Sequence, residues 1–582
     1  MNTRSAIALI ALSIVTSICS CYLWAVPASR VPVTLIQPDG TKIEALLGGD
    51  EYAHFYKDCI TGNFLIQDEG TGFWRQMTQA EVESDMQKAR YARNAAGTSK
   101  TIGGVSLTGD VHLPVLLIEF QDLRFTEQFG SVAHYDSILN SETYIETVYK
   151  TSAGVPYTAR SARNYYMTQS SGLFRPTFDI IGPVLLDHNY SYYGSNAGVK
   201  DTRWQEALSE GAQKAINQGL ITNGAQWDCD GDKIVDLMYF IYAGYSEAQG
   251  AGANYIWPKN GTLSYSVLTA DEVQICNVSC SSELRGKPSD ASPMDDGIGT
   301  IVHEFGHALG LPDFYDTTYS DTCYGMDAWS VMDQGNYNGR GHIPSSMTLH
   351  ERMILGWARP KELPTEGEVT LEPISTSNQG YILYNPANRN EYLCFENHQH
   401  DGNWDQCWGG GNYAINPSRS GLLVTHVDYD YFAWRYNKVN NTASHQRCTP
   451  LPADGTLDNY LTSWFNQALT NPDAAADRAE WYESFKADIY PGIKNVTTLN
   501  TSNPWAIWFT GDSIEIDITN IEELPDLTLR LTIGNGGNSG IHVLNGCEDA
   551  DYRERHVIFD SNRRLLISNG KKVYDLSGKA VK

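Results

Sequence analysis

The sequence is short of basic residues and of long apolar runs. Its 582 residues hold 42 Lys and Arg against 69 Asp and Glu, which gives a formal net charge of −27. Such a surface repels phosphate backbones and excludes nucleic acid as a partner. Beyond residue 30, no apolar run is long enough to cross a bilayer, so we expect no integral membrane domain in the mature chain. Hydrophobic residues at 41% and charged residues at 19% are typical of globular domains.

The single long apolar run, Ala6 to Cys19, follows a short start that carries Arg4. This is the build of a secretory signal peptide, and Val26-Pro27-Ala28 provides a small-residue cleavage site. We therefore predict a signal peptide over residues 1–28 and an exported protein, secreted or held at the cell surface. Cys21, in a lipobox-like context, is an alternative processing point that would leave a lipid anchor.

The chain has few cysteines, and the number that follows the signal sequence is odd. Nine cysteines follow the signal sequence, so at least one thiol is free or paired with another molecule even though export permits disulfides. They are Cys59, Cys229, Cys276, Cys280, Cys323, Cys394, Cys407, Cys448 and Cys547.

The chain divides into segments of different character. Residues 29–97 alternate short strand-like runs with turn signals, which predicts a small N-terminal domain. In residues 98–360 a buried strand is expected near 113–120, an amphipathic helix over 202–218 and a strand over 237–242. From 361 to 533 short strand-like runs recur between turn clusters, which predicts a β-sandwich. The runs are 367–372, 380–384, 391–396, 421–429, 513–518 and 527–533. A Gly-rich linker separates them from a tail, 541–582, that is a candidate sorting segment.

The segment that carries chemistry is His303-Glu304-Phe305-Gly306-His307, followed by Gly310 and Asp313. On a helix, histidines four residues apart project from one face and can chelate one zinc ion. Glu304 lies where it can act as general base. Gly310 allows the helix to end at positive φ, so that Asp313 can turn back as a third ligand and leave the fourth position open. This HExxHxxGxxD pattern predicts a zinc metalloendopeptidase.

A methionine stands nineteen residues past Asp313, at Met332. At this spacing it is typical of the Met-turn, the apolar floor beneath the zinc site of metzincins. A thermolysin-like site needs a Glu ligand from a second helix, and the first Glu after Glu304 is Glu351. Glu351 is therefore the alternative third ligand if Asp313 is not one.

With these motifs the chain resembles the immune inhibitor A (InhA-like) family of secreted bacterial zinc metallopeptidases, in its Bacteroidetes-like form. The resemblance implies an α+β fold with a propeptide (29–97), a metzincin-like catalytic domain (98–360) and the β-sandwich (361–533). It also implies a zymogen that hydrolyses extracellular proteins or peptides. The residues that carry the resemblance lie at 115–122, 163–166, 170–172, 178–183, 239–250, 280–284, 296–316, 329–335 and 355–357.

Residues near the motif have candidate supporting roles. Tyr337 is a candidate for oxyanion support, although it is not at the usual position after the Met-turn. Asp316 and Asp333 could orient a ligand imidazole or cap a turn. Cys59, in the expected propeptide, could occupy the fourth zinc position and hold the enzyme latent, or be an inert thiol.

A second cation site is predicted in residues 228–236. Asp228, Asp230, Asp232 and Asp236 alternate around Gly231. The backbone carbonyl of Ile234 would complete an oxygen shell of the kind that Ca²⁺ prefers. The alternative is a solvated acidic turn.

Two functions of different class remain open. One is a secreted zinc endopeptidase; the other is a catalytically silent surface binding protein on a metzincin scaffold. The presence of Glu304 together with the three ligands and Met332 favours the enzyme, because binding alone does not need that carboxylate.

Overall fold

The computed structural model describes residues 32–82 and 105–534, the short pieces 23–24 and 26–29, and four short strands near the C-terminus. The apolar run of the signal peptide, Cys21, Cys547 and the Gly-rich linker lie outside the described residues. Two compact units result, residues 1–535 and 536–582. The undescribed positions inside the main ranges are 51–52, 69, 79, 151–153, 155, 197–200, 319–322, 401–403, 409–415, 418–419 and 458–485.

A six-stranded sheet forms the centre of the part between residues 105 and 360, in the order β1-β12-β13-β11-β7-β10. Strands β10, β7, β11 and β13 run parallel, whereas β12 runs antiparallel to β13 and pairs with β1 on its other side. The expected strand and the second apolar run are confirmed as β7 and β11. The strands are β1 (Leu23–Trp24), β7 (Gly109–Glu119), β10 (Phe174–Leu185), β11 (Met238–Tyr242), β12 (Lys259–Leu268) and β13 (Gln274–Ser282).

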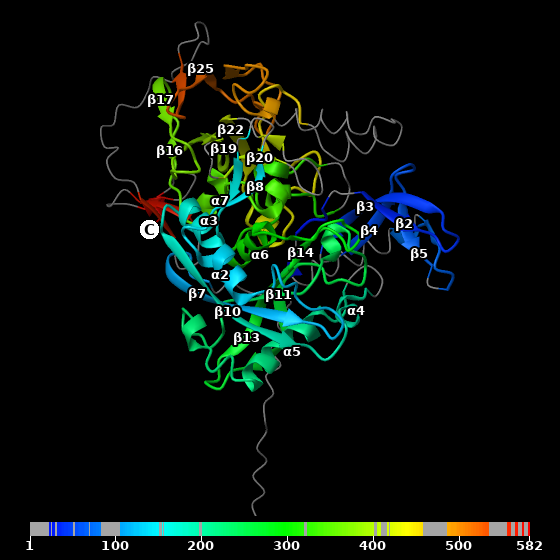
Figure 1. The fold of residues 1–582 in the computed structure, drawn as a ribbon. Helices are drawn as coiled ribbons and strands as arrows, with labels where there is room; N and C mark the ends of the chain where they lie inside the picture. The colour runs from blue at the N-terminus through cyan, green and yellow to red at the C-terminus, as the bar shows by residue number, and fades with distance from the viewer. Residues whose placement is uncertain are drawn as a thin grey trace, which may run out of the picture. The chain divides into compact units, whose positions relative to one another are not determined.

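Helices cover both faces of this sheet (Figure 1). Val115 and Leu117 of β7 belong to a core shared with α2 (Val132–Asn140), α3 (Ala162–Gln169) and α6 (Gly299–Leu309). The alternate residues of β7, Leu116 and Ile118, belong to a second core with α5 (Trp204–Asn217), the helix expected over 202–218. A strand buried on both faces explains the unbroken apolar run in the sequence.

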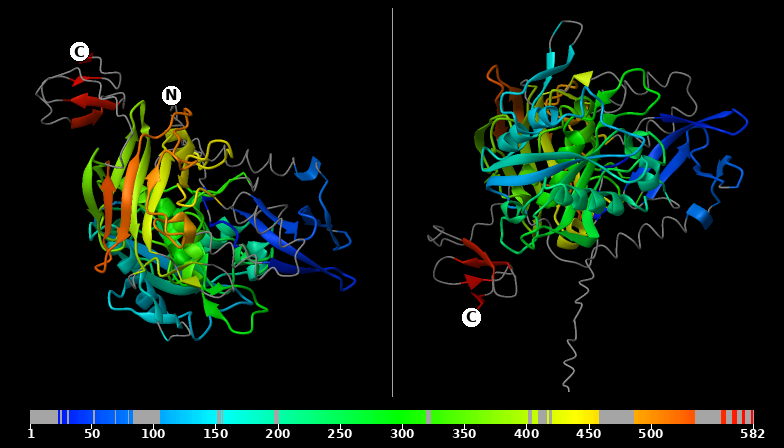
Figure 2. Two further views of the ribbon diagram at one scale, coloured as in Figure 1. Left: turned by 90° about the horizontal axis from the view of Figure 1, so that it is seen from above. Right: turned by 60° about the horizontal axis from the view of Figure 1, so that its bottom comes forward.

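The downstream part contains two sheets, one of five strands and one of four. Side chains from both form one buried cluster, with Leu393 and Val424 from the first sheet and Leu371 and Leu531 from the second. In Figure 2 the orange strands of the second sheet lie beside the yellow-green strands of the first. The sheets are β16 (Lys361–Glu362), β18 (Tyr381–Asn385), β19 (Asn388–His398), β22 (Gly421–Asp428) and β23 (Cys448–Pro450), and β17 (Gly367–Leu371), β26 (Leu529–Ile533), β25 (Asp517–Glu523) and β24 (Leu499–Asn500).

One strand prediction for this part was wrong in position. The run expected as a strand over 513–518 makes only an isolated bridge between Ser513 and Ile507, and regular pairing begins at Asp517 with β25. The alternation of polar and apolar residues continues through this segment, so periodicity alone did not locate where hydrogen-bonded pairing starts.

Residues 32–76 form an antiparallel meander of five strands. Its apolar side chains, including Val33 and Leu47, share a core with Ala248, Trp257 and Tyr337. The small N-terminal domain is therefore packed against the segments that surround the candidate site. Its strands are β2 (Pro32–Ile36), β3 (Lys42–Asp50), β4 (Ala53–Asp58), β5 (Phe64–Gln67) and β6 (Trp74–Gln76).

None of the helices in the described structure has the length and apolar character to span a bilayer.

Short elements complete the described structure. They are β8 (Glu146–Lys150), β9 (Pro156–Ala159), α4 (Tyr190–Gly194), η1 (Ala225–Trp227), η2 (Glu247–Gln249), β14 (Leu284–Arg285), β15 (Met294–Asp295), η3 (Asp327–Trp329), η4 (Gln334–Gly341), α7 (Leu349–Ile354), β20 (Cys407–Trp408), β21 (Asn416–Pro417), α8 (Tyr431–Arg435) and, in the C-terminal unit, β27 (His556–Phe559), β28 (Leu565–Ser568), β29 (Val573–Tyr574) and β30 (Ala580–Val581).

Candidate metal centre

Helix α6 carries the histidine motif, and all eleven of its residues are buried. It ends at Gly310, which adopts φ +111° as the sequence predicts, and the backbone N–H groups of Gly310 and Leu311 both bond to the carbonyl of Gly306. This left-handed cap reverses the chain directly after the helix. Asp313 is thereby carried back toward the face of the helix that bears the two histidines.

Three ligand atoms converge beside the helix. The Nε2 atoms of His303 and His307 are 3.1 Å apart, and each lies 3.3 Å from Oδ1 of Asp313. Tetrahedral zinc with bonds of about 2.0–2.1 Å separates its ligand atoms by about 3.3 Å. All three side chains are fully buried, and Asp313 Oδ1 has no hydrogen-bond donor among the described residues. The arrangement therefore fits a zinc ion held by two imidazoles and one carboxylate.

The protonation of the donor set also suits a metal. His303 Nδ1 lies 2.7 Å from the carbonyl oxygen of Val331, and His307 Nδ1 lies 2.9 Å from that of Leu311. A carbonyl accepts a hydrogen bond, so both rings carry their proton on Nδ1 and present a lone pair at Nε2. Burial lowers the pKa of His307, which keeps that imidazole neutral. Burial raises the pKa of Asp313, and the contacts with the two imidazoles lower it. The lowering is the larger effect, so the pKa lies below its usual value and the carboxylate is ionised.

The carbonyl contacts change the prediction for Asp316 and Asp333. Each was a candidate for orienting an imidazole, but the Nδ1 atom of each ring already contacts a backbone carbonyl. Asp333 instead accepts the backbone N–H groups of Met326 and Asp327, and Asp316 accepts that of Thr318. Both carboxylates therefore stabilise turns, the other role considered for them.

A residue that the sequence did not indicate holds the third ligand in place. Asn437, 124 residues downstream, donates from Nδ2 to Asp313 Oδ2 at 2.5 Å and accepts the backbone N–H of Asp313 at 2.7 Å. Asn437 is buried and adopts φ +53°, a conformation that asparagine tolerates better than most residues. No local motif marks it, because the contact joins segments 124 residues apart.

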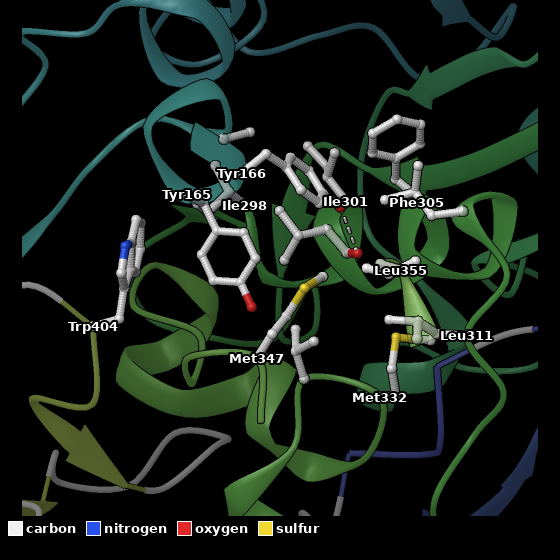
Figure 3. Close-up of a cluster of buried hydrophobic side chains, with 14 of the residues drawn as sticks. Tyr165, Tyr166, Ile298, Ile301, Phe305, Leu311, Met332, Met347, Leu355 and Trp404 are labelled. Atoms are coloured by element: carbon white, nitrogen blue, oxygen red, sulfur yellow. Dashed lines mark hydrogen bonds between the residues drawn. The ribbon is translucent and has the colours of Figure 1, made fainter. Parts of the chain in front are cut away.

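Met332 lies beneath the helix in a tight turn closed by the bond from Asp333 N–H to the Ser330 carbonyl. Its side chain is fully buried, and a Cβ added at Gly306 would come within 2.6 Å of its sulfur. Figure 3 shows Met332 beside Leu311 in the apolar cluster that supports α6, where the hydroxyl of Tyr166 also bonds to the carbonyl of Val302. Met332 therefore packs against the helix that carries the two histidines, and its role as a Met-turn stays a prediction.

The carboxylate of Glu351, the alternative third ligand, makes hydrogen bonds away from the two histidines. It accepts the hydroxyl of Ser330 at 2.7 Å and, with Thr348, closes a reciprocal cap at the start of α7. Burial raises the pKa of Glu351 to about 7. Among the described residues, the ligand group on α6 is completed by Asp313 and does not include Glu351.

A segment from the N-terminus lies against the motif. The backbone N–H of Val26 donates to Glu304 Oε1 at 2.8 Å. The carbonyl of Val26 accepts the indole N–H of Trp257 at 3.0 Å, and that of Pro27 accepts the Tyr337 hydroxyl at 2.9 Å. Burial raises the pKa of Glu304 well above its usual value. Residues 26–29 thus occupy the space next to the general-base candidate, and Tyr337 binds a backbone carbonyl there.

Cys59 is not part of this centre. It is a free, half-buried thiol packed against the main core, and its backbone N–H bonds to the carbonyl of Glu44. Burial raises its pKa to about 12, which disfavours the thiolate that a metal ligand must provide. The contact with Glu304 is made by the backbone of Val26 instead.

The acidic loop gathers three of its four carboxylates. Ligand atoms of Asp228, Asp230 and Asp232 lie within 4.8 Å of one another. Backbone N–H groups of residues 231, 232 and 233 bond to Asp228, so the loop is also held by its own hydrogen bonds. Asp236 is buried, accepts the N–H of Cys229 and has its pKa raised to about 6, mainly by burial.

Comparisons with known proteins agree with this geometry. Residues 104–354 match the family described as immune inhibitor A peptidase M6, catalytic domain. Immune inhibitor A of Bacillus thuringiensis subsp. alesti is 25% identical over 264 residues, which is 40% of this chain and 38% of that protein. The pre-pro-metalloprotease PrtV of Vibrio cholerae serotype O1 is 26% identical over 272 residues, 41% of this chain and 29% of PrtV. The chain thus aligns with well under half the length of these relatives.

The family match indicates a metallopeptidase domain in this part of the chain. More particularly, the similarity is to the catalytic domain of the immune inhibitor A, or peptidase M6, family, over residues 104–354.

Replacing Asn437 with glycine should weaken zinc binding. Glycine keeps the positive φ but removes both hydrogen bonds to Asp313, and loss of such a supporting partner typically lowers metal affinity about 10–100-fold. Competition with a zinc chelator measures the affinity. Asn495→Gly, at an exposed position with the same φ of +53°, is the matched control and should bind zinc like the unmodified chain. Equal affinity in both variants would show that Asn437 does not support the ligand.

Proposed function

We propose that the protein is a zinc-dependent endopeptidase that is exported, made as a zymogen, and hydrolyses extracellular proteins. The observation that carries this proposal is the convergence of His303, His307 and Asp313 on one point, with Glu304 beside it. We further propose the order propeptide, metzincin-like catalytic domain, β-sandwich and a C-terminal segment used for sorting.

The chemistry follows from the residues around the centre. Zinc bound here would polarise the scissile carbonyl and make water a stronger nucleophile. Glu304 would take the proton of the attacking water and pass it to the leaving nitrogen. The position of Val26 supports this role, because its N–H donates to Glu304 Oε1 where a leaving amine would need a proton. For Tyr337 we propose binding of the substrate backbone, in place of oxyanion support, because its hydroxyl bonds to the Pro27 carbonyl.

The second candidate is a binding protein that keeps the scaffold without turnover. Oε2 of Glu304 is buried and has no hydrogen-bond donor among the described residues. An unpaired buried carboxylate oxygen is costly to keep. A role in proton transfer accounts for it, whereas binding alone does not.

We also propose that residues 26–29 hold the zymogen inactive. They are buried in the space where a substrate would meet Glu304, and the N-terminal sheet that follows them packs on Trp257 and Tyr337. Latency through this segment requires that export leaves Val26 attached. We therefore favour a leader that ends before Val26, of which processing at Cys21 is one form, over cleavage after Ala28.

The acidic loop remains our proposal for a calcium site, with Asp228, Asp230, Asp232, Asp236 and the Ile234 carbonyl as ligands. Three carboxylates so close together repel one another unless a cation lies between them. The loop lies between η1 and β11, so we propose a structural role for calcium there.

Glu304→Gln should abolish hydrolysis without releasing zinc. The amide cannot accept a proton, and general-base catalysis is worth about 100- to 10,000-fold. Casein hydrolysis by the processed chain, with zinc content measured in parallel, tests this. Activity of the unmodified chain should disappear with a chelator and return with zinc. Zinc-loaded protein that cleaves neither casein nor a peptide library would support the binding protein instead.

Val26→Asp should make the unprocessed chain active. The new carboxylate would lie beside Glu304 in a buried site, and two close carboxylates repel one another. We expect peptidase activity before processing to rise at least about tenfold. Ile36→Asp is the control, because Ile36 is 63% exposed on the same N-terminal sheet. N-terminal sequencing must find Val26 in the unprocessed chain; a start at Ser29, or equal latency of both variants, would refute the mechanism.

Calcium should raise the melting temperature of the chain through the acidic loop. Because the ion binds the folded state, the stabilisation should grow with free calcium concentration. Asp230→Asn together with Asp232→Asn should remove the calcium-dependent shift while leaving zinc content unchanged. A shift of the same size in the double variant would place calcium elsewhere.

A further inference from the structure

A buried group of side chains near residues 26–29 surrounds one residue of the N-terminal sheet. His54, on β4, is 2% exposed at its side chain and stacks on the indole of Trp257, with ring centroids 4.1 Å apart. Its Nδ1 lies 2.9 Å from Oε2 of Glu247. We call the surrounding residues of the catalytic part the His54 niche; they are Asn196, Asp201, Glu247, Trp257 and Lys259.

The two carboxylates of the niche, Asp201 and Glu247, have different ion-pair partners. Asp201 pairs with Lys259 at 2.7 Å, and both groups belong to the catalytic part. Glu247 is bonded by Asn196 Nδ2 at 2.9 and 3.1 Å and pairs with His54. Burial raises the pKa of Glu247 to about 8, although the Asn196 hydrogen bond and the charge of Lys259 act in the opposite direction. When the N-terminal sheet leaves, Glu247 loses the partner that His54 provides.

The niche adjoins residues 26–29, the segment that lies against Glu304. Trp257, which stacks on His54, also donates its indole N–H to the Val26 carbonyl. The carbonyl of Ala248, next to Glu247, accepts the N–H of Ser29 at 2.8 Å. Because the Val26 nitrogen is at Glu304, Val26 corresponds to the first residue after a scissile bond and Ser29 to the fourth. A substrate on this path would pass beside Glu247.

We propose that, after the N-terminal sheet is released, the His54 niche binds an arginine or lysine side chain of the substrate, within the first five residues after the scissile bond. This rests on the proposed peptidase function and on release of residues 26–29. An indole face and a carboxylate together suit a guanidinium or ammonium group, by stacking and charge pairing. His54 in the zymogen occupies the place of that side chain.

A metal ion is the competing occupant. Ligand atoms of His54, Asp201 and Glu247 lie within 4.8 Å of one another, close enough to share an ion. Lys259, however, already places a buried ammonium 2.7 Å from Asp201. A divalent cation would be repelled by this charge at short range. One of the three donors also belongs to the N-terminal sheet, so the mature chain would not retain the full set.

Cleavage of a peptide series by the processed full chain tests the proposal. The peptides share one scissile bond and carry Arg, Lys, Gln or Glu at each of the first five positions after it in turn. At one position, kcat/KM for Arg and Lys should exceed that for Gln by about tenfold, with Glu the poorest. Glu247→Gln should remove this preference, so that the ratio of kcat/KM for the Arg peptide over the Gln peptide falls to about one. Glu272→Gln, an exposed change in the same domain, should keep it.

Each other outcome has a defined meaning. Equal rates for Arg and Gln peptides in the unmodified chain, or a preference retained in Glu247→Gln, would overturn the subsite. Cleavage of no peptide would instead contradict the proposed peptidase function. A divalent metal that remains in the His303→Ala zymogen and is lost with Glu247→Gln would make the niche a metal site. Circular dichroism of the Glu247→Gln zymogen checks that it is folded.

Discussion

The structure depends on a single electrostatic constraint, the packing of two imidazole lone pairs and a carboxylate oxygen within 3.3 Å of one another in a site without solvent. Three electron-rich atoms at such distances repel one another unless a cation draws them together. The surroundings are built to keep them there. Helix α6 is buried along its whole length, Gly306 leaves room for Met332, and backbone carbonyls fix the rotation of both rings.

This constraint links parts of the chain that would otherwise be separate domains. Asn437, next to helix α8 in the downstream part, holds the carboxylate of Asp313 from the opposite side to the histidines. Residues 26–29, which precede the N-terminal sheet, reach the same centre through Val26. The candidate metal centre is therefore contacted from both flanking regions, and the two contacts differ in kind. The downstream contact holds a candidate ligand, whereas the N-terminal one is made with the general-base candidate Glu304.

Local features of the sequence were enough to predict the inner part of the site. Histidines at a spacing of four, a glycine at the helix end and a methionine after a short loop are constraints within about thirty residues of one another. The strands β7 and β11 and helix α5 were equally readable from periodicity. Asn437, Val26 and His54 were not, because their roles arise from contacts across 124 or more residues. An ordinary asparagine, a valine next to a cleavage site and a lone histidine carry no local signal of such contacts.

The contact between Asn437 and Asp313 also sets an order of events during synthesis. The histidine helix leaves the ribosome well before residue 437, and domains generally fold from the N-terminus as they emerge. Until the downstream sheets have formed around β22, Asp313 lacks the amide that fixes its carboxylate. A nascent or truncated chain that ends near residue 360 would hold a metal weakly and in a poorly defined geometry. The downstream part thus contributes to the candidate metal centre, and any chain that ends before Asn437 lacks the amide that bonds to the carboxylate of Asp313.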